Sequence, residues 1–364
     1  MSKSFHNLSI KKVTNETPDA ITLTFNVPAE LKENFKYTQG QHLTLKFNLN
    51  GKEERRSYSM CSSPLDSDLS VTIKKVQGGK VSTHVHQSIK VGDVIEVMQP
   101  DGRFYTKLHE DNKKNYYLVG AGSGITPLMS ILKTVLEKEP MSCVFLLYGN
   151  RDEDSIIFKN ELEALQKRYA GQLMIEHVLS QPKREKKSGL GGLFSKGKIT
   201  WEGKTGRIDG AVMKKFLTEN APRHKASEFF LCGPGGMIDS VEKTLLDEGF
   251  NKENIHHEYF TAAGPVTVAS GVAGAKVIAT LDGKTHEVAV PEGKHILFAL
   301  LDEKVDAPYS CTSGACSTCM AKLISGTVKM DACYALDDSE VANGFILTCQ
   351  SHPTTDVVEL TFDV

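Results

Sequence analysis

Apolar and polar residues alternate along the first third of the chain. Segments 21–27, 42–48 and 69–76 carry apolar side chains at every second position, and segment 94–98 runs into a Pro-Asp-Gly turn. A period of two places successive side chains on opposite faces of a strand. Short strands separated by turn signals predict an antiparallel β-barrel or sandwich up to about residue 110.

The pattern changes near residue 113, where short apolar runs alternate with segments of helical periodicity. Strands are predicted at 116–120, 143–148, 174–179 and 228–232, and helices at 127–136, 156–169 and 237–248. Strands that alternate with helices are typical of a parallel α/β sheet. We therefore predict an α/β domain over residues 111–261.

Two further segments have the composition of connections. Residues 181–204 are rich in Lys, Gly and Ser and lack core-forming periodicity, which predicts a mobile surface loop. Residues 262–275 are dominated by Ala, Gly and Val and are predicted to form a linker. Beyond the linker, strands are predicted at 276–281 and 286–290, followed by a helix at 296–303.

Composition narrows the class of protein. The chain has 364 residues, 40% of them hydrophobic and 24% charged, which is ordinary for a soluble protein of two or three domains. A net charge of −2 gives no basic field for a nucleic-acid partner. Neither a run of about 18 apolar residues nor a signal peptide is recognisable, so a cytoplasmic protein without a membrane span is expected.

Four cysteines near the C-terminus carry the most specific spacing. Cys311, Cys316 and Cys319 form C-x4-C-x2-C, and Cys349 follows 30 positions later. This is the plant-type [2Fe–2S] spacing. A structural zinc site or a set of buried thiols is the alternative, but zinc sites usually show two C-x2-C pairs. The other four, Cys61, Cys143, Cys232 and Cys333, are scattered and predicted to be reduced, Cys333 as a packing residue.

Two glycine-rich turns follow predicted strands of the α/β domain. The first is Gly120-Ala-Gly-Ser-Gly-Ile-Thr-Pro127 and the second is Cys232-Gly-Pro-Gly-Gly-Met237. Glycines there let a diphosphate approach backbone N–H groups at a helix N-terminus. Each turn alone is also compatible with a tight connection that binds nothing. Together at one sheet edge they predict a dinucleotide crevice.

Two short motifs in the first domain are suited to an anionic, planar ligand. In Arg55-Arg-Ser-Tyr-Ser-Met60, Arg56 offers a planar fork for phosphate and Tyr58 an aromatic face. Gly78-Gly-Lys-Val-Ser-Thr83 adds a glycine-and-hydroxyl cradle for phosphate. An ordinary polar strand is the alternative for the first motif.

The order R-x-Y-S, G-G-x-x-S, G-x-G-x-x-P, C-G-P and then the cluster spacing resembles the ferredoxin–NADP reductase superfamily with a fused C-terminal ferredoxin. Within it, the chain looks most like the reductase components of phenylacetyl-CoA epoxidases, which serve phenylacetate degradation. The resemblance implies an FAD-binding β-barrel (1–110), an NAD(P)-binding α/β domain (111–261), a linker (262–275) and an α+β β-grasp ferredoxin domain (276–364).

The resemblance also implies the flavin-binding residues. Arg56 would pair with the FAD pyrophosphate, Tyr58 would stack on the isoalloxazine and Ser59 would hydrogen-bond near N5. The diphosphate would be held by Gly79, Lys80, Val81 and Ser82. Glu258, Tyr259 and Phe260 would line the flavin face.

The nicotinamide nucleotide site is implied in the same way. Its shape would come from Gly122, Gly124, Thr126 and Pro127, with Cys232 and Gly233 beside the nicotinamide ring. The family binds the 2′-phosphate of NADPH with a serine and nearby basic residues. Ser180, followed by Lys183, Arg184, Lys186 and Lys187, therefore favours NADPH over NADH, although the charge run is equally compatible with a solvated loop.

These expectations combine into one reaction. A flavin connects a two-electron hydride donor with one-electron acceptors. We expect hydride transfer from NAD(P)H to FAD, with Tyr58, Ser59, Cys232 and Glu258 at the reacting atoms, and then single-electron steps to a cluster near about −400 mV. The linker would let the ferredoxin domain swing from flavin to acceptor.

The expected acceptor is an oxygenase component, first a di-iron phenylacetyl-CoA epoxidase. Alternatives are a ring-hydroxylating oxygenase, a desaturase or a cytochrome P450, or a redox-sensing role without turnover. The acidic stretch Asp337-Asp-Ser-Glu340 is a candidate acceptor-binding surface, or simply a solvated helix start.

Overall fold

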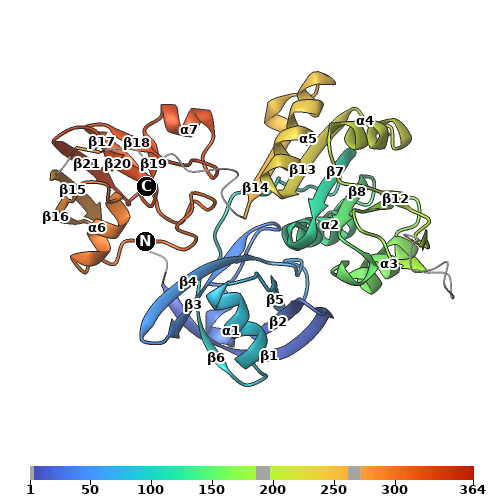
Figure 1. Cartoon of the computed structure of the whole chain (residues 1–364), viewed down its shortest axis with the longest axis horizontal. Coiled ribbons are helices and arrows are strands. Elements are labelled where there is room, and N and C mark those ends of the chain that lie inside the picture. Colours follow the sequence, from blue (N-terminus) through green and yellow to red (C-terminus); the bar gives the residue numbers. More distant parts are fainter. Residues whose placement is uncertain (1–3, 186–196, 261–270, 273) are drawn as a thin grey trace.

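The computed structural model describes residues 4–185, 197–260, 271–272 and 274–364 (Figure 1). Three sheet-containing regions follow one another along the chain, with the first below and between the other two in the view of Figure 1. Most of the predicted linker, 262–270 and 273, lies outside the described residues. Ala275, expected to end the linker, instead begins the first strand of the third region.

The first region is a closed antiparallel barrel, as predicted. Its sheet has the order β4-β3-β6-β1-β2-β5. The strands are β1 Phe5–Thr17, β2 Ala20–Asn26, β3 His42–Leu49, β4 Lys52–Ser59, β5 Leu69–Lys74 and β6 Val94–Met98. A bridge between Met60 and Val71 joins the two edges of the sheet. Helix α1, Lys80–Ser88, inserts Val81 and Val85 into the barrel core.

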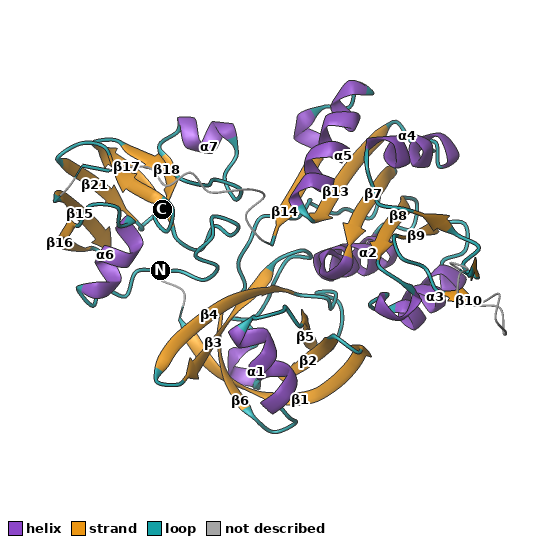
Figure 2. Ribbon diagram, in the orientation of Figure 1, coloured by secondary structure: helices purple, strands orange, loops and turns teal. Residues whose placement is uncertain are grey.

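The second region is a parallel α/β domain (Figure 2). Its sheet has the order β12-β9-β8-β7-β13-β14, and every neighbouring pair is parallel. The strands are β7 Lys114–Ala121, β8 Cys143–Asn150, β9 Leu173–Leu179, β12 Lys204–Thr205, β13 Ala226–Gly233 and β14 Ile255–Tyr259. Because β7 and β8 are buried along nearly their whole length, they read as continuous apolar runs.

Helices cover both faces of this sheet. α2 Ile125–Lys138 and α3 Lys159–Arg168 contribute to one buried cluster, and α4 Gly210–Glu219 and α5 Gly235–Asp247 to another. A short 3₁₀-helix, η2 Gly122–Gly124, joins β7 to α2. Other 3₁₀-helices within the described residues are η1 Ala29–Leu31, η3 Glu153–Ser155 and η5 Lys252–Asn254.

The described ends of segment 181–204 are not the loop that composition predicts. β10 Arg184–Glu185 pairs antiparallel with β11 Lys198–Ile199, and β12 adds a parallel strand beside β9. Backbone pairing with neighbouring strands orders these residues without any apolar periodicity of their own. Residues 186–196 lie outside the described part.

The third region, residues 275–364, is called the ferredoxin domain below. Its five-stranded sheet has the order β16-β15-β21-β17-β19, the mixed arrangement expected of a β-grasp fold, and β18 pairs with β20. The strands are β15 Ala275–Leu281, β16 Lys284–Val290, β17 Met320–Ser325, β18 Val328–Met330, β19 Phe345–Leu347, β20 Ser351–Pro353 and β21 Val357–Thr361. Helix α6, Ile296–Asp302, packs on the sheet, and α7, Asp338–Ala342, lies outside it.

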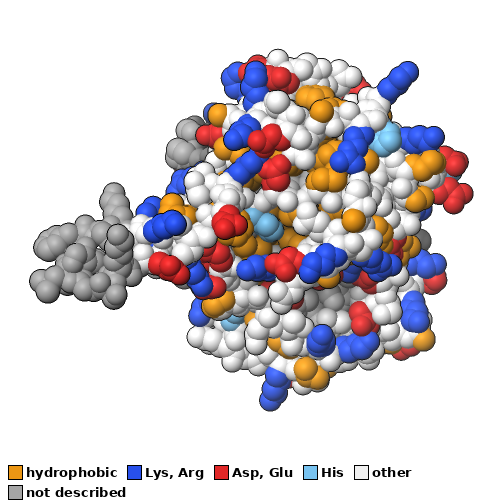
Figure 3. Space-filling model, turned by 90° about the vertical axis from the view of Figure 1, so that its right-hand side faces the viewer, with side chains coloured by type: hydrophobic (Ala, Val, Ile, Leu, Met, Phe, Trp, Pro, Cys, Tyr) orange, Lys and Arg blue, Asp and Glu red, His pale blue; other side chains and the backbone are white. Residues whose placement is uncertain are grey.

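The surface charges agree with the near-neutral composition of the chain. On the face shown in Figure 3, Lys and Arg side chains are interspersed with Asp and Glu, in line with a net charge of −2. Within the part of the chain that the structure describes, no helix combines the length and apolar character needed to cross a bilayer.

Candidate active site

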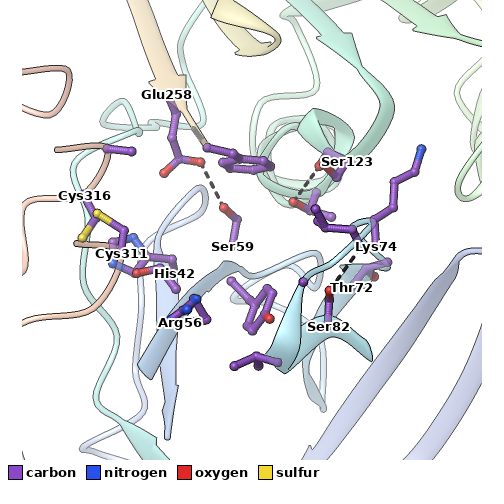
Figure 4. A pocket seen from close by; sticks show the side chains of 18 of the residues that line it. His42, Arg56, Ser59, Thr72, Lys74, Ser82, Ser123, Glu258, Cys311 and Cys316 are labelled. Carbon is purple, nitrogen blue, oxygen red and sulfur yellow. Dashed lines mark hydrogen bonds between the residues drawn. The ribbon is translucent and has the colours of Figure 1, made fainter. Parts of the chain in front are cut away.

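A cavity of about 550 Å³ lies where the three regions meet (Figure 4). Its walls come from β4, the start of α1, the end of β14 and the loop that carries the first cysteines. In Figure 4, Cys311 and Cys316 lie at one end, Ser123 and Lys74 at the other, and Ser59 and Glu258 between them. The predicted flavin residues that line it are Arg56, Tyr58, Ser59, Gly79, Lys80, Val81, Ser82, Glu258, Tyr259 and Phe260.

The start of α1 makes one wall suited to a phosphate. The Gly79–Ser82 segment, predicted as a phosphate cradle, forms the N-cap and the first turn of this helix, whose N–H groups have no partner within the helix. Gly78, at φ +73°, turns the chain into it, and the Val76 N–H donates to Ser82 Oγ at 3.1 Å. Glu54 accepts from Arg56 at 3.0 Å and holds that guanidinium at the same wall.

Ser59 and Glu258 form the polar centre of the cavity. Ser59 Oγ donates to Glu258 Oε2 at 3.0 Å across the boundary between barrel and α/β domain. Burial raises the pKa of Glu258 to about 7, and the hydrogen bond from Ser59 opposes this shift. A carboxyl group with such a pKa can hold or release a proton near neutral pH. Burial also raises the pKa of Tyr58, so its phenol stays neutral.

A second cavity of about 870 Å³ lies at the carboxyl ends of the parallel strands. Gly122, Ser180 and Gly233 line it, as predicted for the nucleotide site. Lys74, Ser123 and Phe260 line both cavities, so the two adjoin. A ligand in the second cavity can therefore reach toward Ser59 and Glu258 in the first.

The residues of the glycine turn between the two cavities occupy different positions. Gly122, at φ +56°, lines the second cavity, and Thr126 lines the first. Gly124 lies behind both, and a Cβ there would stand 2.0 Å from the Cys232 carbonyl oxygen. Its absent side chain lets α2 pack closely against β13. Pro127 is buried in the first turn of α2, where it removes no helical hydrogen bond.

The structure does not bring the Cys232 side chain to either cavity. Cys232 is fully buried in the core, opposite Glu258 in the pairing of β13 with β14. Burial raises the pKa of its thiol well above the usual value. Contact of this thiol with a nicotinamide ring therefore stays a prediction, whereas the backbone at Gly233 does line the second cavity.

The basic side chains of the second cavity differ from those expected. Lys183 Nζ pairs with Asp154 at 2.7 Å, and Arg184 donates to the Gly197 carbonyl, so neither lines the cavity. Lys186 and Lys187 lie outside the described residues. Arg151 and Arg207 line the cavity together with Ser180. Sequence reasoning missed them, although each follows the end of a parallel strand, where ligands of such sheets bind.

The four predicted ligand cysteines come together as two pairs. The thiols of Cys311 and Cys316 are in hydrogen-bond contact, and those of Cys319 and Cys349 form a second such pair. The contact with Cys316 lowers the pKa of Cys311 to about 5. Two thiolate pairs match the two irons of a plant-type cluster, so these residues fit a [2Fe–2S] centre.

The loop around these cysteines also fits such a centre. The Ser313 N–H donates to Cys311 Sγ at 3.4 Å, and Gln350 Nε2 lies 3.7 Å from Cys349 Sγ. N–H groups directed at sulfur stabilise thiolate ligands. Cys333 is partly buried and packs against the ferredoxin core, apart from the two pairs.

Comparison with known proteins identifies each region. Residues 7–105 match the oxidoreductase FAD-binding domain, residues 118–243 the oxidoreductase NAD-binding domain, and residues 279–354 the 2Fe-2S iron-sulfur cluster binding domain. The chain is 36% identical over 366 residues to a component of 1,2-phenylacetyl-CoA epoxidase from Escherichia coli, covering 99% of this chain and 98% of that one. It is 33% identical to the ferredoxin reductase component of 3-ketosteroid-9-alpha-monooxygenase from Rhodococcus rhodochrous, covering 98% and 96%.

Solved structures share the three-region architecture. Phthalate dioxygenase reductase aligns over 98% of both chains with a TM-score of 0.58 and 22% identity. An intact type IV self-sufficient cytochrome P450 monooxygenase aligns with a TM-score of 0.67 and 19% identity, over 98% of this chain and 41% of that longer chain. At these identities the likeness concerns the fold.

Proposed function

The chain belongs to the family of oxygenase reductase components with FAD-, NAD- and [2Fe–2S]-binding domains, and on this premise we propose its coenzyme, its acceptor and its working residues. We propose that it transfers electrons from NADPH, through FAD and the cluster, to the oxygenase component of a phenylacetyl-CoA epoxidase. That acceptor is expected to be a di-iron protein.

The observation that carries the electron path is the shared first cavity. Arg56, Ser59 and Glu258 face the same space as Cys311 and Cys316. When bound, a flavin takes two electrons as a hydride and releases them singly, and a [2Fe–2S] cluster carries one electron at a time. Their sites adjoin without an intervening layer of protein, which suits direct transfer between them.

The residues of the chain would position the flavin and control one proton. The N–H groups at the start of α1 and the Arg56 guanidinium would hold a diphosphate, and the Tyr58 ring would lie against a planar ring. Ser59 and Glu258 would hold a proton beside that ring, since Glu258 titrates near neutral pH.

NADPH is proposed because the second cavity places a hydroxyl and two cations together. Ser180, Arg151 and Arg207 line it, and guanidinium groups bind phosphate oxygens with paired hydrogen bonds. The charge run at 183–187, from which NADPH was expected, contributes no described residue to this wall. We therefore assign the preference for NADPH over NADH to Arg151 and Arg207 instead of the charge run.

The acceptor is proposed from the similarity along the whole chain to the epoxidase component. The test is reconstitution with the oxygenase component of a phenylacetyl-CoA epoxidase, with NADPH-dependent epoxide formation as the readout. A 3-ketosteroid-9-alpha-monooxygenase oxygenase, the acceptor type suggested by a second relative, serves as the matched comparison. We expect turnover with the epoxidase oxygenase alone. Faster turnover with the ketosteroid oxygenase would contradict this assignment while leaving the electron path intact.

A further inference from the structure

Strand β4 carries side chains that serve two different regions of the molecule. Arg56 and Tyr58 line the first cavity, and Glu54 pairs with Arg56 on that side. Arg55, which stands between Glu54 and Arg56, does not line this cavity. It contacts the ferredoxin domain instead.

Arg55 is buried, with only 8% of its side chain exposed. Its Nη2 donates to Asp306 Oδ1 at 3.2 Å, and its guanidinium carbon lies 4.3 Å from the centre of the Tyr309 ring. On the barrel side, its Nε donates to Glu53 at 2.6 Å, and the Phe5 ring centre lies 4.9 Å away. A buried guanidinium needs such partners, and the ferredoxin domain supplies two of them, the Asp306 carboxylate and the Tyr309 ring.

The contact leads directly to the cluster ligands. Ser57 Oγ, two residues along β4, donates to Ser310 Oγ at 2.7 Å, and Ser310 is buried. The next residue is Cys311, which lines the first cavity. Loop 306–310 is thus fixed to the strand that carries Arg56 and Tyr58, immediately before the first ligand.

The ferredoxin domain has further contacts with the α/β domain. Ala315 and Tyr334 pack against a buried cluster of that domain, and the ring centres of Tyr259 and Tyr334 lie 5.0 Å apart.

The cations of the other ion pairs that the described residues form between the ferredoxin domain and the rest of the chain are more exposed than Arg55. Lys252 pairs with Asp338 at 2.7 Å, with 63% and 94% of the two side chains exposed. Arg103 pairs with Glu340, with 50% and 19% of the two side chains exposed. Exposed ion pairs contribute little to stability and are screened by salt. Among the ion pairs that the described residues form between the ferredoxin domain and the rest of the chain, the Arg55 contact has the most buried cation, although 85% of the Asp306 side chain is exposed. Asp306 also begins the loop that leads to Cys311.

We propose that Arg55 is a positioning residue for internal electron transfer. It holds loop 306–310 on β4, and this places Cys311 and Cys316 at the flavin cavity. The inference rests on the proposed function and adds to it a residue that touches neither cofactor site. It also means that one strand sets the positions of both redox sites.

The experiment uses the purified holoprotein and four variants. Arg55→Glu reverses the charge, Asp306→Arg reverses the exposed partner with little risk to folding, and the double variant restores an opposite-charge pair. Lys52→Glu makes the same charge change at an exposed position of the same strand. The first measurement is hydrogen exchange of peptides covering residues 304–310. The second is anaerobic stopped-flow absorbance, which separates NADPH-dependent flavin reduction from cluster reduction.

For Arg55→Glu and for Asp306→Arg we expect faster exchange at 304–310 and cluster reduction slowed about tenfold, because small displacements of reacting groups have large effects on rate. Flavin reduction should stay within about twofold of wild type, and the double variant should regain protection and rate. Unchanged exchange and unchanged cluster reduction in both single variants would overturn the inference alone. A wild-type protein whose flavin is not reduced by NADPH would instead overturn the proposed function, and hydrogen exchange would still test the Arg55 contact.

Discussion

The two cavities are built in different ways. The first draws its walls from all three regions and has the partly buried Glu258 and Tyr58 at its centre. The second lies at the edge of one parallel sheet, apart from Lys74 of the barrel, and its cation Arg151 has a side chain that is 61% exposed. A site with walls from three regions suits a group that stays bound, whereas a site at one sheet edge suits a coenzyme that enters and leaves.

Among the substitutions considered, one at Gly124, between the two cavities, should have the largest effect on the free energy of unfolding. Gly124→Ala would place a Cβ 2.0 Å from the Cys232 carbonyl oxygen and force α2 away from β13. We expect the free energy of unfolding to fall by about 3 kcal/mol, the upper range for overpacking. Chemical denaturation measures it. Gly236→Ala is the control, because its Cβ meets nothing within 4 Å, and an equal loss there would contradict the packing role of Gly124.

Glu258 in the first cavity should make the free energy of unfolding depend on pH. The pKa of Glu258 is raised to about 7 from an ordinary value of 4.5, so the folded protein favours its protonated form. The contribution is complete below about pH 4.5 and is lost as pH rises toward 7, up to about 3 kcal/mol. Denaturation at several pH values, compared with Glu258→Gln, tests this. A variant that keeps the wild-type slope between pH 5 and 7 would contradict the assignment.

Flavin retention should depend on Arg56 and not on the second cavity. Arg56→Ala removes a charge-assisted contact with a diphosphate and should weaken FAD binding about 10- to 100-fold. FAD released on dialysis, measured by fluorescence, is the readout. Lys52→Ala on the same strand is the control. Equal FAD retention in the two variants would remove Arg56 from the flavin site.

The smallest expected effect concerns the second cavity. Arg207→Glu should raise the KM for NADPH about tenfold and leave that for NADH nearly unchanged, because only NADPH carries the 2′-phosphate. Lys183→Glu, whose side chain pairs with Asp154 away from the cavity, should change neither value. A larger effect at Lys183 than at Arg207 would restore the charge run as the coenzyme-specific site.

Features that depend on local pattern and spacing could be predicted from the sequence. The glycine turns, the strands β2, β3 and β5 and the grouping of the four predicted ligand cysteines all follow from such signals. β1 was missed because register shifts at Ile10/Lys12 and Asn15/Thr17 interrupt its period of two. α1 was not predicted, because its nine residues are too few to show a clear helical period.

Other features depend on contacts between distant segments. Arg207 reaches the second cavity because β12 pairs with β9, and that two-residue strand has no pattern of its own. Arg55 looks like its neighbour Arg56 in sequence, and only the docking of Tyr309 and Asp306 distinguishes their roles. Cys232 fits the family motif, yet its side chain belongs to the buried core and lines neither cavity.

Anaerobic titration of the purified protein with NADPH and, separately, NADH is the decisive measurement for the electron path. We expect NADPH to bleach the flavin absorbance and loss of the cluster bands to follow in the same molecule, without any added partner, since the two sites share one cavity. Flavin bleaching with unchanged cluster bands would rule out this path, because the two centres would then not exchange electrons in the docked arrangement.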